Sequence, residues 1–239
     1  MLRKKSSCIL VFCFLIFVSF KQDSVQKLKL ELITKSLHNG KSISIKSDVY
    51  YKVSGGVMVT RSTNPYEKIT ITNANGEFKE YDVKANTLTL IQGLELSSKN
   101  SLFYNFLSGS INDMGLSNLG YKLSKTKMEG KIVVTTWVPS SESKYIKKAE
   151  IAHENFLPIF MGFYDVKDKP LQKSFYSNYQ NVGSIKMPLT ITEFEYITEK
   201  DSVITKRVYS NLKTNSMVED TYLNYKVPAG AKVITAKSK

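Results

Sequence analysis

Ile69-Thr70-Ile71-Thr72-Asn73-Ala74-Asn75-Gly76-Glu77-Phe78-Lys79-Glu80-Tyr81 is the stretch that decides the fold of this 239-residue chain. Two alternating runs, residues 69–72 and 78–81, flank Asn75-Gly76, and a side-chain period of two is typical of a half-buried strand. Asn-Gly favours a tight turn here because both central residues of a type I′ turn need positive φ. The stretch therefore predicts an antiparallel β-hairpin.

Similar runs continue on both sides of this hairpin, separated by short polar turns. The further expected strands are residues 57–60, 87–90, 121–123, 132–138, 145–152, 158–165, 174–179, 189–197, 203–209 and 221–227. Strands joined by short turns form an antiparallel sheet, and twist makes a sheet of this width curl. The pattern predicts a mostly β fold, in which a large curved antiparallel sheet forms an unclosed half-barrel.

The segment before the first glycine pair has apolar residues at helical intervals. Within residues 24–38 these are Val25, Leu28, Leu32, Ile33 and Leu37, and Asn39-Gly40 then supplies a stop. Leu28, Leu30 and Leu32 would also fit a strand. We predict an N-terminal helix over this segment.

A second helical pattern interrupts the strands in the middle of the chain. Apolar side chains recur three to five positions apart between residues 100 and 119, and Gly109 is a candidate C-cap. The pattern predicts a mid-chain helical insertion, either one helix or two short ones. Together with the N-terminal helix it would cover the apolar face of the sheet.

The first twenty residues have the composition of an export signal. Arg3, Lys4 and Lys5 precede an apolar stretch over residues 8–20, which is shorter than the ~20 residues that a membrane-spanning helix needs. We expect a cleaved signal peptide at 1–20 and a single domain at 21–239; an uncleaved membrane anchor is the alternative. Both cysteines lie in the signal, so the domain must be held together by its own core.

The chain is strongly basic, with 34 Lys and Arg, 21 Asp and Glu and a net charge of +13. Such a surface favours acidic partners, anionic lipid head groups or nucleic acid. Export argues against nucleic acid, and the charges are spread along the chain. We therefore interpret them as an ordinary solvated basic surface.

Catalytic signatures are missing from the sequence. The expected domain has no cysteine and two histidines, His38 and His153, and it contains no Gly-x-Ser-x-Gly, His-Glu-x-x-His or glycine-rich phosphate loop. A pair of carboxylates far apart in sequence, as in glycosidases, stays open. We expect no enzyme activity, no cofactor and no metal.

Two further patterns point to a family. The first is Gly56-Val57-Met58-Val59-Thr60-Arg61 followed by Pro65, Asn75-Gly76 and Tyr81-Asp82. The second is the ending Tyr225-Lys226-Val227-Pro228-Ala229-Gly230-Ala231-Lys232-Val233-Ile234. In this order and spacing, over residues 24–234, the chain resembles the LolA-like periplasmic lipoprotein carriers. It departs from them at Ser62, where an aromatic is frequent, and at Phe78, where tryptophan is common.

The resemblance implies both a fold and a function. The fold is an unclosed barrel whose apolar cavity is lidded by helices and holds lipoprotein acyl chains. The function is that of a monomeric periplasmic carrier, which takes acylated lipoprotein or lipid cargo from an inner-membrane donor complex to an outer-membrane acceptor. A carrier of another lipid, or a non-enzymatic envelope sensor or scaffold on the same fold, is the alternative.

Candidate site residues follow from the patterns and from this resemblance. We expect the ligand to contact the inner face of the sheet and one face of the mid-chain helix, through Val57, Val59, Ile69, Ile71, Leu88, Leu90, Leu102, Phe103, Phe106 and Leu107. Plain core packing explains the same residues. The resemblance also implies that Arg61 gates the lid by hydrogen bonding to its backbone. Phe106→Asp should then abolish cargo binding while the fold survives.

Overall fold

β-strands make up most of the computed structural model, which describes residues 24–183 and 185–235. The expected signal peptide, residues 1–20, lies outside the described residues. The strands are β1 (Lys27–His38), β2 (Lys41–Lys52), β3 (Val57–Asn64), β4 (Lys68–Thr72), β5 (Glu77–Asp82), β6 (Thr87–Gln92), β7 (Tyr121–Glu129), β8 (Ile132–Pro139), β9 (Ile146–Glu154), β10 (Leu157–Asp165), β11 (Pro170–Val182), β12 (Ile185–Thr198), β13 (Asp201–Thr214) and β14 (Lys232–Thr235). Within these residues the one α-helix is α1 (Leu102–Leu107), and no helix there has the length and apolar character to cross a membrane.

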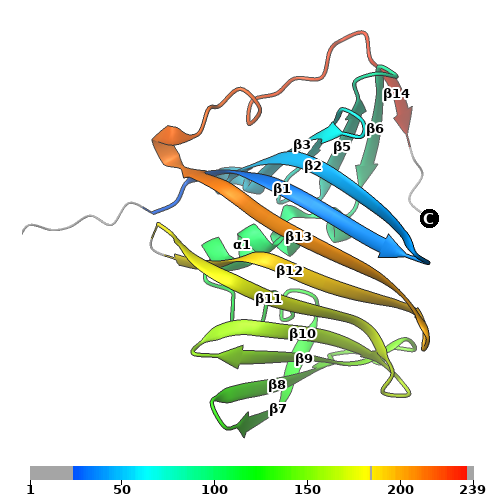
Figure 1. The fold of residues 1–239 in the computed structure, drawn as a ribbon, viewed down its shortest axis with the longest axis vertical. Helices are drawn as coiled ribbons and strands as arrows, with labels where there is room; N and C mark the ends of the chain where they lie inside the picture. The colour runs from blue at the N-terminus through cyan, green and yellow to red at the C-terminus, as the bar shows by residue number, and fades with distance from the viewer. Residues whose placement is uncertain (1–23, 184, 236–239) are drawn as a thin grey trace, which may run out of the picture.

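All the described strands form one curved sheet, in the order β14-β6-β5-β4-β3-β2-β1-β13-β12-β11-β10-β9-β8-β7 (Figure 1). The chain runs from β1 outward to β6 and crosses to the far edge through residues 93–120. It then returns from β7 to β13, which pairs with β1. Neighbouring strands are antiparallel except for β14, which lies parallel to β6. The predicted large, unclosed sheet is confirmed.

The predicted N-terminal helix is wrong, because residues 27–38 form strand β1. Leu28 and Leu30 are each 1% exposed. The buried residues therefore follow the alternating period of a strand and not the period of a helix. Asn39 and Gly40 have φ of 49° and 71°, and they form the two-residue turn that joins β1 to β2 with His38 opposite Lys41. The supposed helix stop is therefore a hairpin turn.

The predicted hairpin between β4 and β5 is present, with Thr72 opposite Phe78, but its turn differs from the expectation. Gly76 has a φ of 79°, whereas Asn75 is not among the residues with positive φ. The Asn73 side-chain oxygen accepts hydrogen bonds from the backbone N–H groups of Asn75 and Glu77, at 2.9 and 3.2 Å. This side chain closes a longer loop, which replaces the two-residue type I′ turn.

Gly76 and Gly40 make a matched pair of turn glycines for testing this geometry. A methyl group on Gly76 would overlap the carbonyl oxygen of Gly93, whereas one on Gly40 would meet nothing within 4 Å. Both glycines have positive φ, which costs other residues about 1–2 kcal/mol. We expect Gly76→Ala to lower the free energy of unfolding by at least about 1 kcal/mol more than Gly40→Ala does. Urea denaturation measures both, and equal losses would contradict the tight approach at Gly93.

The mid-chain insertion is less helical than the sequence predicts. Helix α1 ends at Leu107, and Gly109 follows its C-cap with a φ of 76°, as expected for a helix terminus. Beyond it, Met114 and Gly115 also have positive φ, at 48° and 81°, so residues 108–120 form turns. A single helix over residues 100–119 is therefore wrong, since left-handed residues cannot continue one, and the alternative of a second short α-helix after α1 is not formed in residues 108–120.

The two faces of the sheet are covered by different segments. Helix α1 packs on one face, called here the α1 face, where it contacts β12 (Figure 1). Residues 218–231, called here the C-terminal strap, cover part of the opposite face. In the strap Val218 and Leu223 are buried, and the Tyr222 ring lies 5.1 Å from that of Tyr50.

The strap replaces the strand expected at residues 221–227, which is not formed. The reason is topological. After β13 the chain must pass the strands β1 to β6 to reach the sheet edge, where β14 pairs with β6. A segment that crosses over strands cannot hydrogen bond within the same sheet, so its apolar residues pack face-on instead.

Candidate functional site

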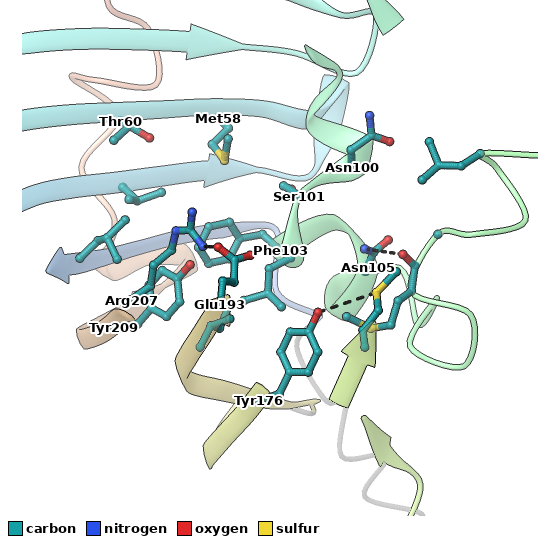
Figure 2. Close-up of a pocket in the computed structure, with 18 of the residues that line it drawn as sticks. Met58, Thr60, Asn100, Ser101, Phe103, Asn105, Tyr176, Glu193, Arg207 and Tyr209 are labelled. Atoms are coloured by element: carbon teal, nitrogen blue, oxygen red, sulfur yellow. Dashed lines mark hydrogen bonds and ion pairs between the residues drawn. The ribbon is translucent and has the colours of Figure 1, made fainter. Parts of the chain in front are cut away.

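The α1 face holds a cavity of ≈ 480 Å³ between the sheet and the helical insertion (Figure 2). This volume is within the range of ~300–1,000 Å³ typical of small-molecule sites. Much of the wall is apolar, with Leu32, Val49, Met58, Leu102, Phe103 and Ile191 among its side chains. A second set of lining groups is polar and includes Thr60, Glu193 and Arg207.

Strand geometry places these side chains together. Residues two apart on a strand share a face, so Met58 and Thr60 on β3 both line the cavity. The same spacing brings Ile191 and Glu193 in from β12. In register with these, Arg207 on β13 lies opposite Ile191. The side of the cavity formed by the sheet is thus built from central strands.

The cover of the cavity is anchored beside it. Phe106 is 2% exposed, with its ring 6.2 Å from that of Tyr179, and Leu116 is fully buried. The Asn105 side-chain nitrogen donates to the Met114 carbonyl at 3.3 Å and joins the two halves of the cover. The cover is therefore fixed by its buried residues, while Leu102 and Phe103 face the cavity.

Neutral phenol groups lie beside the charged ones in this wall. Burial raises the pKa of Tyr209 to about 12, so its hydroxyl stays protonated at neutral pH. Burial also raises the pKa of Tyr176, whose hydroxyl points at the sulfur of Met161 at 3.9 Å. A thioether is a weak acceptor. The Tyr176 hydroxyl therefore remains available to a better acceptor.

The helical candidates from the sequence divide into two pairs. Leu102 and Phe103 line the cavity. Phe106 and Leu107 do not line it and pack in the surrounding core instead. The helical spacing predicted one shared apolar face, but a six-residue helix held against a sheet buries some of that face outside the cavity.

The strand candidates lie on the wrong face for this cavity. Val57, Val59, Ile69, Ile71 and Leu88 form a separate cluster with the C-terminal strap. Leu90 shares their face by register, because both it and Ile71 pair with Lys79. The expectation that these six residues line the inner face beneath the helix is therefore wrong. Their alternation identified a buried face correctly, but the sequence did not reveal that both faces are covered.

Arg61 also lies on this opposite face, with its partners there. Its Nε and one terminal nitrogen donate to Glu67 Oε1 at 2.9 and 2.6 Å, and its guanidinium lies 5.2 Å from the centre of the Tyr222 ring. The hydrogen bonds to Glu67 raise the pKa of Arg61. The resemblance implied hydrogen bonds from Arg61 to the lid backbone. In the described structure Arg61 instead contacts Tyr222 of the C-terminal strap.

A gating role would make Arg61→Leu alter cargo release more than stability, whereas the observed placement predicts the reverse. We expect this substitution to lower the free energy of unfolding by about 1 kcal/mol, through the loss of an exposed ion pair and a cation–π contact. Uptake and release of an acyl probe should be unchanged, because the cavity is on the other face. Stopped-flow release of a fluorescent fatty acid checks this, and a changed release rate would restore the gating role to Arg61.

A second cavity, of ≈ 660 Å³, lies near the tips of the β7–β8 and β9–β10 hairpins. Met128 and Phe156 line it and are 71% and 89% exposed. His153, another lining residue, is buried and donates through Nε2 to the carbonyl of Ile111 at 2.9 Å. In the described residues no three His, Cys, Asp or Glu side chains gather as a metal site would require.

The comparisons with known proteins show that solved structures share the fold of this chain. No protein-family model matches it, and no curated protein does. Among solved structures, a DUF1329 family protein from Desulfovibrio piger aligns with a TM-score of 0.56 at 16% identity, over 85% of this chain and 92% of its own.

Two further structures align equally well. A LolA superfamily protein from Nitrosomonas europaea has a TM-score of 0.55 at 14% identity, over 84% of this chain and 92% of its own. A domain from Vibrio parahaemolyticus named for outer membrane lipoprotein sorting has a TM-score of 0.58 at 13% identity, over 85% and 92%. At these identities the likeness concerns the fold. The chain has the LolA-like fold that its sequence patterns indicated.

Proposed function

We propose that the protein is a carrier that binds lipoprotein acyl chains in the cavity on the α1 face and shuttles them between membranes. The observation that carries this proposal is a largely apolar cavity of ≈ 480 Å³, held between a curved sheet and a short helical cover in a LolA-like fold. Lipoprotein sorting in the name of one structural neighbour supports the same cargo class.

Energetics make such a cavity necessary and also limit how tightly it should bind. Each methylene removed from water contributes ~0.8 kcal/mol, so an acyl chain of about fifteen methylenes gains on the order of 12 kcal/mol. Lipid therefore cannot cross an aqueous gap unaided. A carrier that kept all of this energy would never release its cargo. A cover whose Leu102 and Phe103 enter the same space as the cargo would lower the net affinity.

The cellular setting of this proposal rests on the expected signal peptide. Export would place the carrier in the periplasm. There it would act as a monomer, receiving cargo from an inner-membrane donor complex and delivering it to an outer-membrane acceptor. Binding and release need no covalent step, so the proposal includes no enzyme activity and no cofactor. The basic surface suits a partner with acidic groups or anionic lipid.

Native mass spectrometry on the protein purified from its own cell envelope tests the carrier function, with solvent extraction of what it holds. We expect a bound acylated lipoprotein, recognised by its mass. A bound free lipid would make the protein a carrier of another lipid. Protein that arrives empty, and takes up neither an acyl probe nor purified lipoprotein, would overturn the proposal in favour of an envelope sensor or scaffold.

A further inference from the structure

The cavity on the α1 face contains an ion pair whose position bears on the ligand. Arg207 on β13 donates to the Glu193 carboxylate on β12, and both residues line the cavity. Their side chains are 33% and 24% exposed. Deeper lining residues are nearly closed off, with Phe103 at 4% and Ile191 at 5%. The ion pair therefore lies at an opening of the cavity, called here the mouth, and nearer to solvent than these apolar residues.

Further polar groups surround this mouth. Ser36 and Thr205 hydroxyls lie 3.0 Å apart on the neighbouring strands β1 and β13, and Thr205 pairs directly with Glu193. Figure 2 shows Arg207, Glu193 and Tyr209 together beside Phe103. The α1 face thus changes from apolar beneath the helix to polar at its open end.

The charges of the pair leave the mouth polar but without net charge. A guanidinium offers five donors in a fixed fork, and the hydrogen bond to Glu193 uses one nitrogen. The carboxylate likewise has lone pairs left for a donor. A ligand with only a negative head group would meet Glu193, and one with only a positive head group would meet Arg207. Either would suffer like-charge repulsion, which is a means of rejecting ligands.

We propose that this ion pair selects acyl ligands whose head group carries one anionic and one cationic group, the anion on Arg207 and the cation on Glu193. This inference rests on the proposed function, since it takes for granted that an acyl chain fills the cavity beneath α1. Two sources share the chemistry: a zwitterionic phospholipid, and an acylated peptide with one acidic and one basic residue. The apolar wall contacts the acyl chain, and the ion pair at the mouth binds the charged groups of the head group attached to that chain.

The inference is tested by measuring how well competing ligands displace a bound fluorescent fatty acid. All competitors carry one sixteen-carbon chain and are used below their critical micelle concentrations. Lysophosphatidylcholine and an N-palmitoyl Lys-Glu amide are the two zwitterionic competitors and separate the two sources. Lysophosphatidic acid is the anionic competitor and hexadecyltrimethylammonium the cationic one. We expect the wild type to bind at least one zwitterionic ligand about tenfold more tightly than either singly charged ligand.

Variants of the pair should shift this preference in opposite directions. Glu193→Gln leaves Arg207 unopposed and should raise affinity for the anionic ligand about tenfold, while Arg207→Met should do the same for the cationic ligand. Glu80→Gln is the matched control, because Glu80 forms a comparable cross-strand pair with Lys68 at 2.8 Å and does not line the cavity. This control variant should bind the four ligands with the same order of affinities as the wild type.

Each outcome of this experiment bears on one proposal. Equal binding of all four ligands, with no shift in either variant, would overturn the head-group inference and leave the carrier intact. No binding of any ligand would overturn the carrier function itself. If a single variant fails to fold, the exchanged pair Arg207→Glu with Glu193→Arg keeps both charges and should retain the zwitterionic preference; loss of that preference in a folded exchange variant would contradict the inference.

Discussion

Replacing Phe106 with alanine is expected to lower the free energy of unfolding by about 3–5 kcal/mol, the cost of deleting a buried aromatic ring. Phe106 is 2% exposed and its ring lies 6.2 Å from that of Tyr179, so the helix depends on it for attachment to the sheet. The six-residue helix is too short to be stable without such packing. Urea denaturation followed by circular dichroism measures the loss.

Leu107→Ala is the matched control for this substitution. Leu107 is the next residue of α1 but is only half-buried, so its loss should be less than half as large. A loss below about 1 kcal/mol for Phe106→Ala would show that α1 is not packed as described. The burial of Phe106 also changes the interpretation of Phe106→Asp. A carboxylate at this position would have no solvent, so the variant should unfold and cannot report on cargo binding alone.

Thr60→Trp is expected to reduce acyl-probe binding at least tenfold without a comparable loss of stability. Thr60 lines the cavity from β3 and is half-buried, so an indole at this position would extend into the space that the chain needs. The substitution fills the cavity and leaves the anchors Phe106 and Leu116 untouched. Titration of a fluorescent fatty acid measures the affinity, and the midpoint of urea unfolding confirms that the fold is kept.

Thr70→Trp is the control that separates blocking from a general effect of tryptophan. Thr70 on β4 lies directly opposite Thr60 on the same face of the sheet, but it does not line the cavity. Its variant should bind the probe within about twofold of the wild type. Equal loss of binding in both variants would mean that the probe does not enter the cavity described here.

The strand content and the unclosed sheet could be predicted from alternation and turn residues, but the ends of the chain could not. In residues 27–38 Leu28 and Leu32 fit both the helical and the alternating period. The segment becomes a strand because it hydrogen bonds to β2 on one side and to β13 on the other. The strap shows the converse. Its apolar residues alternate as in a strand, yet the route from β13 to the sheet edge forces it to lie across the face.

The candidate site was predicted in part, through Leu102 and Phe103, because the insertion stood out from the surrounding strands. Arg207 and Glu193 were missed. Glu193 follows Leu189 and Ile191 on the apolar side of β12, and a charged residue in that position was the available signal. The side of β13 that carries Arg207 mixes polar and apolar residues, so that strand offered no such signal. Alternation reports two faces of a strand but not which element covers each of them. For that reason the strand candidates Val59 and Ile69 were assigned to the wrong side.

Photo-cross-linking locates the bound chain and so tests the central claim most directly. A palmitoyl probe with a diazirine near the end of its chain is bound, irradiated and mapped by peptide mass spectrometry. We expect cross-links on the cavity residues Leu102, Phe103 and Ile191. Cross-links concentrated instead on Met128 and Phe156, at the second cavity, or on the C-terminal strap, would contradict an acyl site beneath α1.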